Sequence, residues 1–303
     1  MASVAKNTQR VYTLNTGSKI PAIGLGTWQS KPNEVRVAVE AALRAGYRHI
    51  DAAAAYGNEA EVGDGIRDSG VPRSDIWLTT KLHNQWHTRV SEALDKSLEA
   101  LGTDYVDLYL IHWPSSTDPT DLKKHLPDWD YVKTWEEMQK LLSTGKVKNI
   151  GVSNFGIAHL TRLLGSETCK VVPAINQIEL HPNNPSPKLV AFNTSKDIHS
   201  TGYSCLGSAG SPLYSNKTLI HLAESKGKTV QQVLIMWGLQ KGWSVIPKSV
   251  NPARISANFA VDGWELTEDE VAIVDAIPER FKVCDGSFLP PEMHGKVFLG
   301  DDE

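Results

Sequence analysis

A chain of 303 residues can bury a large core, and its size suits either two ordinary domains or one α/β barrel. Its 31 Lys and Arg against 35 Asp and Glu give a net charge of −4, and no long run of one sign occurs. This balance argues against a nucleic-acid or anionic-membrane surface as the main function, so neither is expected as a partner.

The cysteines and the hydropathy pattern indicate the compartment. Cys169, Cys205 and Cys284 are odd in number and form no CxxC or histidine-bearing metal pattern, so we expect reduced thiols and no metal site. The N-terminal segment lacks an apolar run of signal-peptide length, and no stretch approaches the roughly 18 apolar residues of a membrane span. The sequence therefore predicts a soluble, cytoplasmic protein.

The predicted elements begin with a hairpin and continue as alternating strands and helices. Residues 11–14 and 19–20 flank the turn-prone Asn15-Thr16-Gly17-Ser18, which predicts a short β-hairpin. Eight short runs rich in β-branched or aromatic residues follow and are predicted to be strands. They cover residues 23–26, 47–51, 76–81, 106–112, 147–152, 174–179, 200–203 and 244–246.

Between these runs, apolar residues recur with the spacing of amphipathic helices. Examples are Val35, Ala38, Val39, Ala42 and Leu43 after the first strand, Leu94, Leu98 and Leu101 after the third, and Trp135, Met138, Leu141 and Leu142 before the fifth. Short apolar strands that alternate with such helices are typical of parallel βα units. Eight units fit a closed barrel better than an open sheet, because no run has the polar character of an edge strand. We therefore predict an α/β fold, a single (β/α)8 TIM barrel over residues 1–303 with a short N-terminal β-hairpin.

Two segments do not fit simple βα units. Residues 114–130 form a long polar loop after the fourth predicted strand, and residues 278–303 form a tail that contains Pro290-Pro291. Loops that follow the strands of a barrel lie on its C-terminal face, where active sites are built. Both segments are therefore predicted to shape a substrate pocket, the tail as a C-terminal substrate loop.

Four polar residues fall at one end of three consecutive predicted strands. Asp51 ends the second strand and Tyr56 lies in the loop behind it, while Lys81 ends the third strand and His112 the fourth. Taken alone, each is more often structural than catalytic. Because all four stand at the same end of neighbouring predicted strands, we predict that they converge as a catalytic group.

The chemistry of this group points to carbonyl reduction. The ammonium of Lys81 should lower the pKa of Tyr56 from its usual value near ~10, with Asp51 as the counter-ion of the lysine. His112 could orient a carbonyl oxygen or relay a proton. Such a site protonates a carbonyl oxygen but needs hydride from elsewhere, which predicts a nicotinamide cofactor.

The segments GYRHIDAAAAYGNEAEVG, DYVDLYLIHWP, IGVSNF and IPKSVNPARISANF resemble, in order and spacing, the aldo-keto reductase superfamily, and the likeness covers essentially the whole chain. The resemblance implies the (β/α)8 barrel and places the family's catalytic Asp, Tyr, Lys and His on Asp51, Tyr56, Lys81 and His112.

The resemblance also implies a cofactor site and a substrate pocket. The residues expected at the nicotinamide are Ser153, Asn154 and Gln177 for its carboxamide and Tyr203 stacked on its ring. Along the rest of the cofactor, Ser204, Leu206 and Ser208 are expected on the pyrophosphate side. Lys248, Ser249 and Arg254 are expected at the adenosine 2′-phosphate and Asn258 near the adenine, with Thr27, Trp28 and Val250 as further contacts. The expected pocket walls are Trp28, His83 and Trp113. Three positions depart from many relatives: His83 replaces a common tryptophan, Cys205 a common proline, and Ala257 a Glu or Gln.

NADPH is the expected form of the cofactor. The sequence has no G-x-G-x-x-G, since Gly24-Leu25-Gly26 continues without the third glycine, so the Rossmann mode is not expected. Lys248 and Arg254 provide two cations for the 2′-phosphate that only NADP(H) carries. The direction expected from the resemblance is reduction.

The sequence thus predicts a monomeric NADPH-dependent aldehyde reductase, an alcohol dehydrogenase (NADP+) type enzyme, in which Tyr56 supplies the proton. Its partner is a small carbonyl substrate, with sugar-derived aldehydes such as glyceraldehyde, pentoses and uronates as candidates. One alternative is a cofactor-bound partner of other proteins, or a structural protein, with the same fold. A glycosidase would need two catalytic carboxylates; Glu179 and Asp51 are formally available, but a lysine beside Asp51 opposes a raised pKa.

Overall fold

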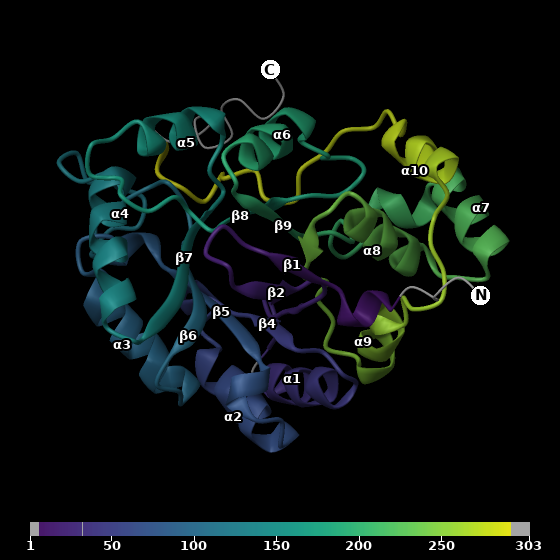
Figure 1. The fold of residues 1–303 in the computed structure, drawn as a ribbon, viewed down its shortest axis with the longest axis horizontal. Helices are drawn as coiled ribbons and strands as arrows, with labels where there is room; N and C mark the ends of the chain where they lie inside the picture. The colour runs from purple at the N-terminus through teal and green to yellow at the C-terminus, as the bar shows by residue number, and fades with distance from the viewer. Residues whose placement is uncertain (1–5, 32, 292–303) are drawn as a thin grey trace.

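The computed structural model describes residues 6–31 and 33–291, so residues 1–5 of the N-terminal segment and residues 292–303 of the predicted tail lie outside the described residues. A ring of parallel strands forms its centre (Figure 1). In ring order these strands are β3 (Leu25–Gly26), β4 (His49–Asp51), β5 (Trp77–Leu82), β6 (Val106–Ile111), β7 (Val147–Ser153), β8 (Ile175–Glu179), β9 (His199–Tyr203) and β10 (Ser244–Val245).

The ring closes between its first and last strands. Parallel bridges join Ile23 to Val245 and Gly26 to Lys248, and the amide of Gly24 donates to the carbonyl of Val245 at 2.9 Å. Gly26 permits this approach, because a Cβ there would come within 2.8 Å of the Ile246 carbonyl oxygen. The predicted barrel is confirmed, and each predicted strand overlaps an observed one.

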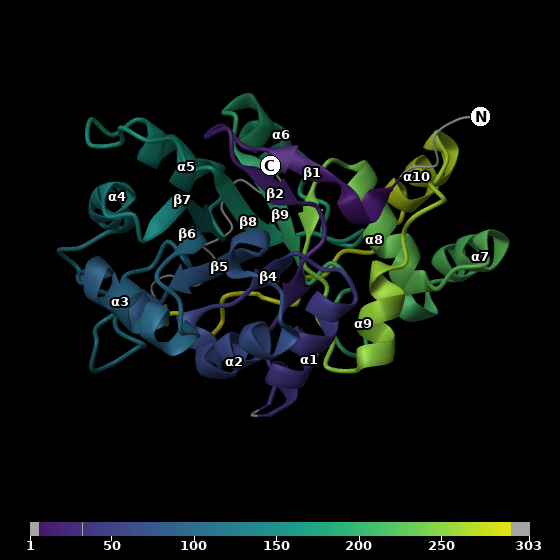
Figure 2. The same cartoon turned by 60° about the horizontal axis from the view of Figure 1, so that its bottom comes forward.

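In the described part of the chain, eight helices follow the strands one by one and cover the ring. They are α1 (Glu34–Arg44), α2 (Glu59–Ser69), α3 (Val90–Leu101), α4 (Tyr131–Lys140), α5 (Ile157–Leu164), α6 (Pro187–Ser195), α8 (Val230–Gln240) and α9 (Pro252–Phe259). Two more helices, α7 (Lys217–Lys226) and α10 (Glu268–Asp275), contact each other on the side of the barrel that carries α8 and α9 (Figure 2).

Local sequence explains how these helices attach and end. The apolar stripe of α1 is buried, and Gly46, with φ at +108°, turns the chain from this helix toward β4. The side chain of Asp130 caps α4 by accepting from the amides of Val132 and Lys133. Apolar periodicity and helix caps can be recognised in the sequence itself. For this reason the predicted helical segments coincide with observed helices.

The N-terminal hairpin is also confirmed. Its strands β1 (Val11–Thr13) and β2 (Lys19–Pro21) pair antiparallel, with Tyr12 opposite Ile20. Ile20 is fully buried and packs in one apolar cluster with Trp77 and Ile175, which lie at the starts of β5 and β8. The hairpin therefore covers the N-terminal mouth of the barrel, in front of the ring in Figure 1, and leaves the opposite mouth for the site.

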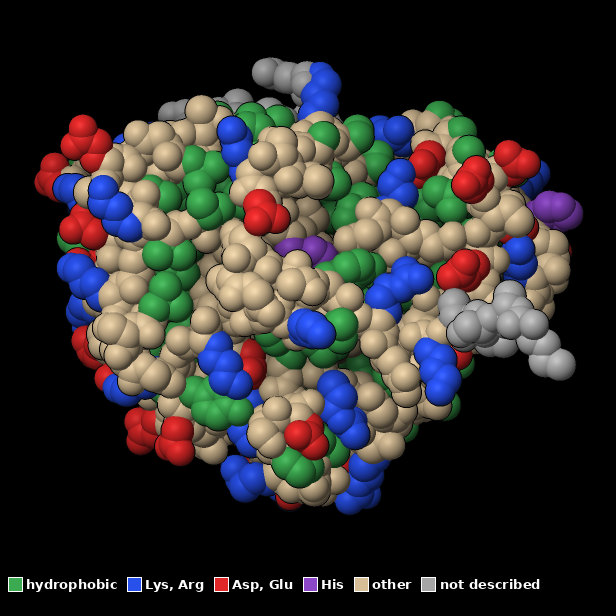
Figure 3. All heavy atoms as spheres, viewed as in Figure 1, with side chains coloured by type: hydrophobic (Ala, Val, Ile, Leu, Met, Phe, Trp, Pro, Cys, Tyr) green, Lys and Arg blue, Asp and Glu red, His purple; other side chains and the backbone are tan. Residues whose placement is uncertain are grey.

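The surface carries charges of both signs. Acidic and basic side chains are intermixed around the face shown in Figure 3. Within the described ranges 6–31 and 33–291, no helix combines the length and the apolar character that a bilayer crossing requires.

Candidate active site

The four predicted catalytic residues come from neighbouring strand ends. Asp51 is the last residue of β4, and His112 follows β6 directly. Lys81 lies in β5 opposite Leu110 of β6, and Tyr56 ends the short 3-10 turn η2 (Ala54–Tyr56) behind β4. Parallel strands present their carboxyl ends at one mouth of the barrel, so residues far apart in sequence meet there.

Lys81 is the centre of this group. Its Nζ lies 2.5 Å from Asp51 Oδ1, 2.9 Å from the carbonyl oxygen of Ala52 and 3.3 Å from the Tyr56 hydroxyl. The side chains of Lys81 and Asp51 are 0% and 2% exposed. A fully buried ammonium is stable only with a counter-ion and hydrogen bonds, and this geometry supplies both.

The other oxygen of the Asp51 carboxylate has a partner as well. Gln177 Nε2, on β8, donates to Asp51 Oδ2 at 2.7 Å, and the hydroxyl of Thr27 donates to the backbone carbonyl of Asp51 at 2.8 Å. Burial lowers the pKa of Lys81, and the Asp51 carboxylate opposes this change. The pair is therefore fixed from several strands at once.

The expected direction of the Tyr56 pKa shift was wrong. Burial of the hydroxyl raises the pKa of Tyr56 well above 10, and the negative charge of Asp51 raises it further. Lys81 does not reverse this effect, because Asp51 already compensates its charge at 2.5 Å. The phenol therefore stays protonated at neutral pH, and it can still donate to an alkoxide, which is a much stronger base than a phenolate.

His112 lies edge-on to Tyr56, with the ring centroids 5.6 Å apart and an interplanar angle of 74°. Burial lowers the pKa of His112 well below 6.5, and the positive charge of Lys81 lowers it further. The ring is therefore neutral at physiological pH, so only one of its nitrogens carries a hydrogen. Its Nδ1 is buried and finds no hydrogen-bond partner among the described residues.

The residues expected at the nicotinamide gather at the ends of β7, β8 and β9. Ser153 Oγ donates to the carbonyl of Gln177 at 2.8 Å, and Asn154 Nδ2 donates to the carbonyl of His112 at 2.9 Å. The hydroxyl of Tyr203 donates to Asn154 Oδ1 at 2.7 Å. Asn154 therefore links the backbone of His112 to the expected stacking tyrosine, a connection that spacing alone could not predict.

The turn after β9 contains the three residues expected along the pyrophosphate. Ser204 and Ser208 have φ of +47° and +67°, and Leu206 is buried between them. Gly207 is required in this turn, because a Cβ there would meet Ser211 Oγ at 2.2 Å. A turn that combines right-handed and left-handed residues can direct successive backbone amides toward one side, a geometry that suits an anion.

The residues expected at the 2′-phosphate lie at the start of α9. Lys248 and Arg254 are exposed, and Lys248 Nζ donates to the carbonyl of Gln29 at 3.3 Å. Ser249 Oγ accepts from the amide of Asn251, whose side chain caps the Arg254 amide. Val250 packs against the core and Asn258 is buried on α9. Two cations beside a helix N-terminus form a suitable site for a phosphate.

The expected pocket walls differ in exposure. Trp28 is 38% exposed, Trp113 is 6% exposed and His83 lies between these extremes. Trp113 packs against Leu289, and Phe288 meets its ring edge-on with the centroids 5.0 Å apart. The C-terminal segment therefore covers part of the pocket. The loop 114–130 folds back on itself through a bridge between Thr117 and His125.

Sequence reasoning missed the residues that hold this segment. Glu179, at the end of β8, accepts hydrogen bonds from the amides of Val283 and Cys284, although it was considered only as a glycosidase carboxylate. Glu179 carries the same signal as Asp51, because each is a carboxylate at the last position of a strand. Within residues 6–31 and 33–291, no group of three or more His, Cys, Asp or Glu side chains is arranged to bind a metal ion.

Comparisons with known proteins agree with this geometry. Residues 22–279 match the model of the aldo/keto reductase family. Glycerol 2-dehydrogenase (NADP(+)) of Saccharomyces cerevisiae is 46% identical over 296 residues, which is 92% of this chain and 95% of that protein. D-galacturonate reductase of Hypocrea jecorina is 48% identical over 278 residues, 87% and 89% of the two chains.

Solved structures give the same result. The aldose reductase of Schistosoma japonicum superposes with a TM-score of 0.90 at 35% identity, covering 97% of this chain and 100% of that one. The Bombyx mori aldo-keto reductase in complex with NADP superposes with a TM-score of 0.84 at 38% identity, covering 93% and 98%.

Proposed function

We propose, because this chain belongs to the aldo/keto reductase family, that it is an enzyme that uses NADPH to reduce aldehydes to alcohols. The observation that carries the proposal is the partly buried contact between Lys81 Nζ and the Tyr56 hydroxyl at 3.3 Å, in which the same Nζ also contacts Asp51. When bound, NADPH would supply the hydride, which no side chain can carry.

The roles of the chain's own residues follow from their protonation. Tyr56, protonated at neutral pH, donates its proton to the carbonyl oxygen as negative charge develops there. The buried pair of Lys81 and Asp51 fixes the position of that hydroxyl and contributes a nearby positive charge. His112, neutral, donates one hydrogen bond that orients the carbonyl.

The residues present also fit the cofactor. The amide and hydroxyl groups of Ser153, Asn154 and Gln177 match the carboxamide of a nicotinamide, which needs both donors and acceptors. The exposed cations Lys248 and Arg254, at the start of α9, match the 2′-phosphate of NADPH. The relative solved in complex with NADP supports this choice over NADH.

Hydroxylated aldehydes are the substrate class we favour. His83 stands where the family resemblance leads us to expect a tryptophan, and its imidazole makes this part of the expected pocket more polar. The relatives named for glycerol and D-galacturonate support the same class. The four predicted catalytic side chains all come from one barrel, as a functional monomer requires, and the three free cysteines support a cytoplasmic location.

A substrate panel tests the proposal. Loss of NADPH absorbance is followed with glyceraldehyde, a pentose, a uronate and an aromatic aldehyde, with NADH as the matched cofactor control. We expect turnover with NADPH, fastest for the hydroxylated aldehydes, and weaker turnover with NADH. Quenching of NADPH fluorescence is titrated in parallel. Binding without turnover of any aldehyde would favour the non-enzymatic alternative, and the absence of both binding and turnover would refute the cofactor assignment.

A further inference from the structure

The C-terminal segment 279–291 returns from α10 to the mouth of the barrel. Figure 1 shows this yellow segment running back past β8 toward α5. Residues 279–290 form no helix or strand, but the backbone of this segment is tied to the end of β8 and the loop after it. The carboxylate of Glu179 makes two of these ties.

Both oxygens of the Glu179 carboxylate accept from this segment. Oε1 lies 2.6 Å from the amide nitrogen of Val283, and Oε2 lies 2.8 Å from that of Cys284. His181 Nε2 lies 2.8 Å from the same Oε1. Glu179 is only 2% exposed, so its charge is stabilised mainly by these donors. Hydrogen bonds to a charged acceptor are about twice as strong as neutral ones.

Residues next to Glu179 hold the start of the segment. Asn183 accepts from the amide of Phe281 through its backbone carbonyl at 3.1 Å, and its side chain donates to the carbonyl of Glu279 at 2.8 Å. The rings of His181 and Phe281 stack with their centroids 4.8 Å apart. The segment is therefore attached along residues 279–284 and continues from there toward the pocket.

The attached segment brings one side chain to the predicted catalytic group and two to a predicted pocket wall. Cys284 lies close enough to Tyr56 and Tyr203 to affect the pKa of both hydroxyls. Phe288 and Leu289 pack on Trp113, one of the expected pocket walls. The positions of Phe288 and Leu289 against this wall therefore depend on where residues 283 and 284 are held.

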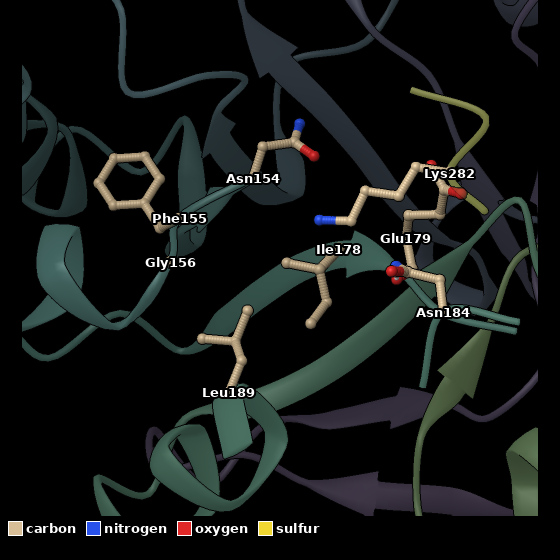
Figure 4. Close-up of a pocket in the computed structure, with 8 residues that line it drawn as sticks. All are labelled: Asn154, Phe155, Gly156, Ile178, Glu179, Asn184, Leu189 and Lys282. Atoms are coloured by element: carbon tan, nitrogen blue, oxygen red, sulfur yellow. Dashed lines mark hydrogen bonds between the residues drawn. The ribbon is translucent and has the colours of Figure 1, made fainter. Parts of the chain in front are cut away.

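The attachment also borders the expected nicotinamide site. Figure 4 shows Glu179, Lys282 and Asn154 around one small cavity at the end of β8. The cavity is small, with a volume of about 10 Å³, and has room for roughly one water molecule. Because Lys282 of the segment and Asn154 line the same cavity, a displacement of the segment would change the surroundings of Asn154.

We propose that Glu179 is a positioning residue that latches the C-terminal segment to the end of β8, and that this latch determines which carbonyl substrates reach Tyr56. The proposal rests on the proposed reductase function. A carboxylate is required because it only accepts hydrogen bonds and offers two oxygens, whereas a glutamine would turn an NH2 group toward one of the two backbone amides.

Glu179→Gln tests the latch, with Glu279→Gln as the matched control. Glu279 lies in the same segment, its side chain is exposed, and the latch uses its backbone carbonyl. We expect E179Q to raise KM for an aromatic aldehyde about tenfold, because such a substrate contacts the wall. KM for glyceraldehyde, kcat, and the Kd for NADPH should change less than about twofold, and E279Q should resemble the wild type.

A double variant separates positioning from general damage. If Glu179 acts by holding Phe288 against Trp113, adding Phe288→Ala to E179Q should change KM for the aromatic aldehyde little further. Each substitution would then remove the same contact. Equal losses for both aldehydes in E179Q, or fully additive effects of the two substitutions, would overturn the proposal. Should E179Q fail to fold, Asn183→Ala tests the same attachment from the other side.

Hydrogen exchange tests the latch without reference to activity. The amides of Val283 and Cys284 should be protected in the wild-type chain and in E279Q, and should exchange at least about tenfold faster in E179Q. Fast exchange of both amides in the wild type would refute the latch. If both amides exchange as expected but no aldehyde is turned over, the proposed function is refuted while the attachment of the segment by Glu179 is supported.

Discussion

The two ends of the proposed cofactor path are built in different ways. At the carbonyl end, Lys81 is 0% exposed and bonded at once to Asp51, Ala52 and Tyr56. At the phosphate end, Lys248 and Arg254 are exposed on the segment that leads into α9. Charges act strongly where water is excluded and weakly where it screens them.

This difference in burial suits the two ends to different proposed tasks, the reaction at the carbonyl end and the choice of cofactor at the phosphate end. A buried, fixed group can stabilise charge that develops in a transition state without reorganising, which is where most catalytic power arises. Exposed cations contribute less each, but they adjust to a flexible phosphate and discriminate between two cofactors that differ by that group. The effects of substitutions at the two ends should therefore differ in size, and they should change different kinetic constants.

The largest effect is expected at the carbonyl end. Tyr56→Phe removes the acidic proton and should reduce kcat by ~10³-fold or more, within the range for loss of a general acid. The Kd for NADPH, measured by fluorescence quenching, should stay within about twofold. The matched control is Tyr12→Phe, whose hydroxyl donates to the carbonyl of Leu239 far from the site. If Tyr56→Phe kept more than about a tenth of the wild-type kcat, the contrast between the two ends would fail.

A smaller and selective effect is expected at the phosphate end. Arg254→Ala should raise KM for NADPH by about 10- to 100-fold, as for loss of a hydrogen bond to a charged group, and change KM for NADH less than about twofold. Arg36→Ala, which removes an exposed arginine paired with Asp68 on another side of the barrel, is the matched control. An equal rise for both cofactors would contradict the assignment to the 2′-phosphate.

The smallest effect is expected from pH. Because burial lowers the pKa of His112 and raises that of Tyr56, the neutral ring and the protonated phenol coexist through the neutral range. Protonation of His112 should lower kcat/KM only below about pH 6.5, and ionisation of Tyr56 only above about pH 10. The profile measured at saturating NADPH should be flat between these limits. An alkaline limb centred between about pH 7 and 9 would instead support a phenol acidified by Lys81.

Local patterns predicted the barrel, and they predicted that four polar residues would converge at one of its mouths. The strands and helices followed from two periodicities, and Asp51, Lys81 and His112 were found because parallel strands place their ends together. The pKa of Tyr56 could not be derived this way. It depends on the burial of a hydroxyl and on how closely Asp51 compensates Lys81, and neither is a property of spacing.

The sequence by itself determined the alternation of strands and helices, the ends at which polar residues stand, and a likeness to one family, because these are encoded in residues close together along the chain. Only the tertiary structure decided that Gln177 supports Asp51 and that Glu179 holds the C-terminal segment near Trp113. Those contacts join segments far apart in sequence, and their geometry depends on how closely the strands pack and which groups water can no longer reach.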